Sequence, residues 1–107
     1  MTAADLKRLL DEFKTGLQAL YAERLKGVYL YGSYARGEAD TESDVDLLVV
    51  LDRLERYGDE IERTSHLVAG LALTFGVSVS RVFLSERDWT SGETSFLANV
   101  REEAVAA

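Results

Sequence analysis

The sequence has no cysteine, no proline and only one histidine, His66. Without cysteine, a disulfide framework, a thiolate zinc site and catalysis by a cysteine nucleophile are all excluded. One histidine cannot build a multi-histidine metal site, so any metal bound here would be a hard cation held by oxygen ligands. His66 falls within a predicted helix, and we interpret it as a partly buried structural residue.

Long apolar runs and an excess of positive charge are also missing. No segment reaches the length of a membrane span, and the N-terminal residues lack the apolar centre of a secretory signal, so a cytoplasmic protein is expected. Twelve basic residues face 19 acidic ones, for a net charge of -7. Such a chain is a poor default binder of nucleic acid or of anionic membranes. A nucleotide could still be held through a divalent cation.

The pattern of apolar residues predicts helices that alternate with strands. With 107 residues, of which 47% are hydrophobic, we expect a single domain spanning residues 1–107. Thr2 is a candidate cap for the first helix, and Gly27 is expected to mark its end. The alternation is typical of an α/β fold. The expected helices are 3–25, 52–75 and 94–105, and the expected strands are 28–31, 45–51 and 77–84.

Two further predictions concern packing. Tyr29 and Tyr31 share one face of the first strand, where packing on the sheet is more common than stacking on a base. The run of acidic and basic residues at 52–63 is most simply a solvated helix face. Neither feature by itself indicates a function.

The first strand runs directly into Gly32 and Ser33. Glycine allows another group to approach the backbone closely. The Ser33 hydroxyl and the N–H groups that follow it could face an anion, and the Arg36 guanidinium would add donors nearby. Taken alone, Gly32-Ser33 reads as a simple turn, and a surface ion pair explains Arg36 equally well.

Asp44 and Asp46 stand two residues apart at the start of the second strand. Side chains at this spacing point to the same face, so the two carboxylates can converge on one cation. Val45, Leu47 and Val49 point the other way, into apolar packing. Two neighbouring carboxylates raise each other's pKa unless a cation intervenes. Mg²⁺ suits this arrangement because it takes one or two carboxylates and completes its shell with water and phosphates.

Together, the pattern Gly-Ser-x-Ala-Arg-Gly at residues 32–37 and Ser-Asp-x-Asp at residues 43–46 resembles the signature of minimal nucleotidyltransferases in the DNA polymerase β superfamily. The resemblance implies a nucleotidyltransferase fold with a small mixed sheet of about three or four strands flanked by helices. It also implies roles for individual residues: Gly32 and Ser33 hold the triphosphate, Arg36 supports the loop or touches phosphate, Ser43 braces the loop, and Asp44 and Asp46 bind Mg²⁺.

The implied reaction moves a nucleoside monophosphate, AMP from ATP, to a hydroxyl and releases pyrophosphate. Small members of this superfamily often act as antitoxins paired with a HEPN-type ribonuclease toxin, which makes such a toxin the expected protein partner. The base preference, the acceptor and the oligomeric state, a homodimer included, stay open.

The sequence departs from the family pattern at one point. Active members usually carry a third carboxylate on a later strand, and the strand predicted at 77–84 contains none. Ser78 or Ser80 stands where that carboxylate is expected, while Glu86 and Asp88 fall beyond the strand. The alternative function is therefore a catalytically degenerate module that binds Mg-nucleotide or another protein.

Overall fold

The computed structural model covers residues 1–107 and confirms the alternation of helices and strands. A 3-10 turn, η1 (Ala22–Arg24), joins the first helix to the first strand. In chain order, the other elements are α1 (Ala3–Tyr21), β1 (Leu25–Tyr31), α2 (Ser33–Arg36), β2 (Val45–Leu51), α3 (Tyr57–Phe75), β3 (Val79–Ser85), α4 (Glu86–Ser91), α5 (Ser95–Glu103) and β4 (Val105–Ala106).

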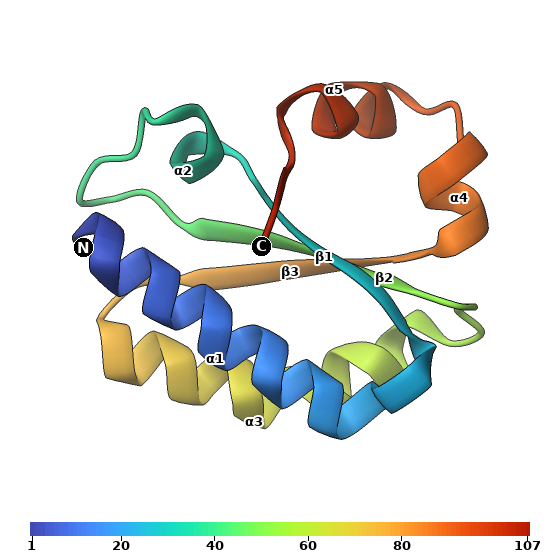
Figure 1. Ribbon diagram of the computed structural model, residues 1–107, viewed down its shortest axis with the longest axis horizontal. Helices are drawn as coiled ribbons and strands as arrows, with labels where there is room; N and C mark the ends of the chain where they lie inside the picture. Colours follow the sequence, from blue (N-terminus) through green and yellow to red (C-terminus); the bar gives the residue numbers. More distant parts are fainter.

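The four strands form one mixed sheet in the order β3-β2-β1-β4. Strand β1 is antiparallel to both β2 and β4, whereas β2 and β3 run parallel. Helices α1 and α3 cover one face of the sheet, and α4 and α5 lie over the other (Figure 1). The predicted fold class, a small mixed sheet flanked by helices, is confirmed.

Strand β2 lies at the centre of the core, and Asp46 is the one residue of this strand that is not fully buried. Val45, Leu47 and Val49 pack with α1 and α3, as predicted. On the opposite face, Leu48 and Val50 pack with residues of α5 and of neighbouring strands. The strand is therefore covered on both sides, and a carboxylate at position 46 interrupts an otherwise apolar segment.

The start of α1 follows the prediction, but its end does not. Thr2 caps the helix through a reciprocal pair of hydrogen bonds with Asp5. The helix ends at Tyr21, not at Gly27, because Ala22 adopts a φ of 49°, which the helix cannot continue. Gly27 instead lies inside β1, next to a shift in the pairing with β2.

Later boundaries also differ from the predicted ones. Helix α3 begins at Tyr57, after an irregular segment at 52–56 in which the Asp52 carboxylate accepts hydrogen bonds from the Arg53 N–H at 2.7 Å and from Arg24 at 3.1 Å. Strand β3 begins at Val79 because the N–H of Val77 still bonds to the last turn of α3. Helix α5 ends at Glu103, since the residues that follow pair with β1 as β4.

One packing prediction is wrong, and two are confirmed. His66 is exposed, whereas the charged run at 52–63 is solvated as predicted, except that Glu60 is buried at 5% exposure. Tyr29 packs on Trp89 and Tyr31 on Phe96, so both tyrosines pack on the sheet as predicted. None of the helices combines the length and the apolar composition needed to cross a membrane.

Candidate functional site

Gly32 forms the turn between β1 and α2. Its φ of 77° and ψ of -158° belong to a region that is essentially restricted to glycine. Its carbonyl oxygen accepts hydrogen bonds from the N–H groups of Ala35 and Arg36, each at 3.1 Å. A Cβ atom at this position would overlap the Oδ2 atom of Asp46. The turn and the Asp46 carboxylate therefore touch, and the contact requires glycine.

Asp44 and Asp46 lie where β2 begins, beside this turn. Asp44 is exposed just before the strand, and Asp46 is half-buried within it. Burial raises the pKa of Asp46, and the charge of Asp44 raises it further, while the hydrogen bond from Ser80 opposes both effects. A cation between the two carboxylates would relieve the cost of ionising Asp46.

The residues at the site fit a single magnesium ion. Their donors are hard carboxylate oxygens at the start of β2, next to the glycine turn, and Mg²⁺ accepts one or two carboxylates when phosphates complete its shell. No group of three or more acidic or histidine side chains is arranged to hold a metal. Asp44 and Asp46 would therefore hold one ion together with a nucleotide, and β3 offers no third carboxylate for a second ion.

Strand β3 decides between the two serines considered for the place of the third carboxylate. Ser80 lies directly beside Asp46 in the parallel pairing, and its Oγ donates to Asp46 Oδ1 at 3.1 Å. Ser78 comes before the strand and is exposed. Glu86 and Asp88 belong to α4, beyond the strand, as predicted. Ser80 is thus the residue of β3 that faces the aspartate pair.

Arg36 and Ser43 support the loop that joins the turn to β2. The Arg36 guanidinium pairs with Glu38 at 3.2 Å and with Glu103 at 2.8 Å. Ser43 Oγ accepts from the Asp40 N–H at 2.9 Å, a contact within the loop. Arg36 therefore makes contacts with both the loop and α5.

Glu103 belongs to the site, although the sequence pattern did not indicate it. Its Oε1 atom accepts a hydrogen bond from the Gly32 N–H at 3.1 Å, and its Oε2 atom accepts from Arg36. In the sequence, Glu103 is one of two adjacent glutamates near the end of a predicted helix, a pattern that resembles any solvated surface. No local signal distinguishes it, because the contact joins residues 71 positions apart.

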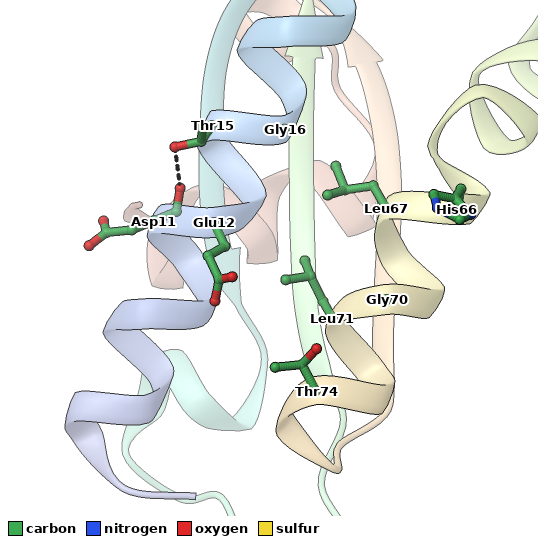
Figure 2. A pocket seen from close by; sticks show the side chains of 9 residues that line it. All are labelled: Asp11, Glu12, Thr15, Gly16, His66, Leu67, Gly70, Leu71 and Thr74. Atoms are coloured by element: carbon green, nitrogen blue, oxygen red, sulfur yellow. Dashed lines mark hydrogen bonds between the residues drawn. The ribbon is translucent and has the colours of Figure 1, made fainter.

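A groove between α1 and α3 is separate from this site. Its lining includes Gly16 on α1 and Leu67, Leu71 and the exposed His66 on α3 (Figure 2). The groove lies on the face of the sheet that α1 and α3 cover. Side chains alternate along β2, so Asp46 points to the same face as Leu48 and Val50, which is the face covered by α5. The groove and the aspartate pair therefore do not form one pocket.

Comparisons with known proteins identify the family of this chain. Residues 7–101 match the model of the nucleotidyltransferase domain family. A Methanocaldococcus jannaschii relative, provisionally named a protein adenylyltransferase, is 34% identical over 98 residues, which cover 91% of this chain and 92% of the relative.

Solved structures share the fold at low sequence identity. A toxin–antitoxin crystal structure with AMP-PNP aligns with a TM-score of 0.65 and 21% identity, over 90% of this chain and 69% of the other. A Shewanella oneidensis complex of a tri-AMPylated HEPN toxin with its MNT antitoxin aligns with a TM-score of 0.60 and 18% identity, over 99% and 71% of the two chains. The fold is thus the polymerase β-like nucleotidyltransferase fold, and the chain belongs to the nucleotidyltransferase domain family.

Proposed function

We propose that the protein transfers AMP from ATP to a hydroxyl group, and that its acceptor is a HEPN-type toxin with which it forms a toxin–antitoxin pair. The observation that carries the proposal is the contact between the glycine-only turn at Gly32 and the half-buried carboxylate of Asp46. The contact brings the turn against the Asp46 carboxylate, with Asp44 two residues earlier in the chain, and a metal-bound triphosphate needs such a combination of turn and carboxylates.

In the proposed reaction the acceptor hydroxyl oxygen forms a bond to the α-phosphorus of ATP. The bond from that phosphorus to the oxygen bridging to the β-phosphate breaks, and pyrophosphate leaves. Asp44 and Asp46 would hold Mg²⁺, which neutralises phosphate charge when bound. The proton of the acceptor hydroxyl would leave to water, because the carboxylates of Asp44 and Asp46 are engaged with the cation and β3 carries no further acid. Gly32 and Ser33 would orient the triphosphate.

The acceptor class rests on charge and on the relatives. A chain with a net charge of -7 repels a polyanionic acceptor such as RNA, which favours a protein or a small molecule. The similar Methanocaldococcus jannaschii protein carries the provisional name of a protein adenylyltransferase, and the similar Shewanella oneidensis complex contains an AMP-modified HEPN toxin. The AMP-PNP in a related toxin–antitoxin crystal supports ATP as the nucleotide.

Replacing both aspartates is the direct test of the nucleotide site. In a calorimetric titration with ATP, the wild type is expected to bind only when Mg²⁺ is present. The Asp44→Asn/Asp46→Asn variant is expected to lose at least about a hundredfold in affinity, because the carboxylates that hold the cation are gone. Glu42→Gln removes one charge from the exposed neighbouring loop and should bind as the wild type does. Equal binding by the wild type and the double variant would refute the site.

A test of the acceptor uses the HEPN-type protein sought among the products of the genes next to the gene of this protein. The two proteins are expressed together, and the partner is examined by mass spectrometry for added AMP. Modification that requires Asp44 and Asp46 would support the proposal. A partner that is neither bound nor modified, although the chain binds MgATP, would refute the toxin–antitoxin assignment and leave the nucleotide site standing.

The second candidate is a module that binds Mg-nucleotide without catalysing transfer. The observation that favours it is Ser80, which lies beside Asp46 on the strand where the family resemblance implies a third carboxylate. On this view the site retains the nucleotide but lacks the group that holds a second metal and activates the hydroxyl.

Ser80→Asp separates the two candidates. If the site is an enzyme weakened by its missing carboxylate, the variant is expected to raise the rate of AMP transfer several-fold or more, since a carboxylate beside Asp46 can complete a two-metal site. The same change is expected to destabilise the metal-free protein, because it sets two carboxylates side by side. The matched control, Ser78→Asp, adds the same charge at an exposed position before the strand. A rate that Ser80→Asp leaves unchanged would favour the non-catalytic module.

A further inference from the structure

Glu103 links the end of α5 to the Gly32 turn. One carboxylate oxygen accepts from the Gly32 N–H at 3.1 Å, and the other accepts from Arg36 Nη1 at 2.8 Å. The Glu103 side chain is 23% exposed, and the Arg36 side chain is 44% exposed. A single carboxylate therefore connects the turn to the guanidinium that follows it in the motif.

The surrounding strands hold Glu103 in this position. Immediately after α5, Val105 and Ala106 pair with Leu30 and Tyr29 of β1, and the Ala107 N–H bonds to the Val28 carbonyl oxygen. Strand β1 is the strand that ends next to Gly32. The register between β1 and β4 thus sets where the carboxylate meets the turn.

Charge makes the contact stronger than a neutral hydrogen bond. The Arg36 guanidinium and the Gly32 N–H hold the pKa of Glu103 below its usual range, so the side chain is ionised at neutral pH. Hydrogen bonds to ionised groups are roughly twice as strong as neutral ones.

The conformation of Gly32 explains why such an anchor matters. Glycine loses more conformational freedom on ordering than any other residue, and a glycine turn left free would sample many shapes. A ligand that binds only one conformation must order the turn when it binds, and the entropy lost in that ordering weakens its affinity. A carboxylate fixed to the Gly32 N–H orders the turn in advance.

We propose that Glu103 is a positioning residue of the nucleotide site. It holds the Gly32 turn and Arg36 in the arrangement that receives the triphosphate, without touching the nucleotide itself. The inference rests on the proposed function, because its main readout is MgATP binding. It assigns a role to α5, a segment outside the sequence motif that defines the site.

The test compares three single variants by calorimetric titration with MgATP and by thermal unfolding. Glu103→Ala is expected to weaken MgATP binding roughly tenfold, since it removes a charge-assisted anchor. Glu103→Gln keeps an oxygen that can accept from the Gly32 N–H and is expected to recover part of that loss. Glu102→Ala removes the same charge from the exposed neighbouring residue of α5 and should bind as the wild type does.

Each result decides a different point. If the wild type fails to bind MgATP, both the proposed function and this inference are wrong. If the wild type binds and Glu103→Ala matches Glu102→Ala, the inference alone is refuted. Tighter binding by Glu103→Ala would also refute it, because Glu103 would then be a competitor for the place of a phosphate. Should Glu103→Ala fail to fold, Glu103→Gln carries the test, and an affinity equal to that of the wild type overturns the proposal.

Discussion

A Gly32→Ala variant is expected to lose magnesium-dependent nucleotide binding and to be strongly destabilised. The added Cβ would overlap Asp46 Oδ2, so the carboxylate must move from its place beside the turn. The backbone conformation, with φ of 77° and ψ of -158°, is also one that alanine rarely adopts, at a cost of about 1–3 kcal/mol before the overlap is counted. Chemical denaturation and MgATP titration measure the two effects separately.

Gly37→Ala is the matched control for this prediction. Gly37 caps the same short helix with φ of 73° and ψ of 23°, and a Cβ added there meets no atom within 4 Å. The variant should therefore lose only about 1–2 kcal/mol in the free energy of unfolding, the cost of placing alanine in the left-handed conformation, and it should retain MgATP binding. If Gly32→Ala binds MgATP as tightly as Gly37→Ala, the contact between the turn and Asp46 is not required for the site.

The second large effect is expected on stability, at the buried Glu60. This carboxylate is 5% exposed and accepts hydrogen bonds from the Tyr21 hydroxyl at 2.7 Å and from Arg63 Nε at 3.0 Å. Glu60→Ala leaves the Tyr21 hydroxyl without its partner and opens space in the core. We expect a loss of about 3 kcal/mol in the free energy of unfolding, a large part of the roughly 5–15 kcal/mol typical of a domain.

Glu62→Ala serves as the control, because Glu62 lies on the same helix and is exposed. Its effect on the free energy of unfolding should stay within about 0.5 kcal/mol. Equal losses in the two variants would show that the buried contacts of Glu60 contribute nothing to stability.

The contribution of Glu60 should also depend on pH. Burial opposes its ionisation, but the hydrogen bonds from Tyr21 and Arg63 hold the net pKa below the usual value of 4.5. A carboxyl whose pKa is lowered by folding stabilises the protein above its unfolded pKa, and this stabilisation is lost as the pH falls through the folded pKa. Glu60→Gln should therefore flatten the loss of stability on acidification below about pH 4.5.

Features that depend on neighbours a few residues apart could be predicted from the amino-acid sequence. The pattern of apolar residues over short windows predicted the α/β class and the β2 strand from Val45 to Leu51. The motif at residues 32–46 identified the turn and the aspartates, because glycine and carboxylates are needed at fixed local spacings. The end of the first helix was predicted wrongly because glycine can either end a helix or lie in a strand, and Gly27 lies inside β1.

The tertiary structure alone decided the contacts between distant segments. The parallel register of β2 and β3 places Ser80, and not Ser78, beside Asp46. The pairing of β4 with β1 brings Glu103 onto Gly32, and packing of α1 against α3 buries Glu60 beside Tyr21. In the sequence, each of these polar residues resembles a solvated surface group. Strand register and helix packing depend on the whole chain, and only they distinguish these residues from ordinary surface groups.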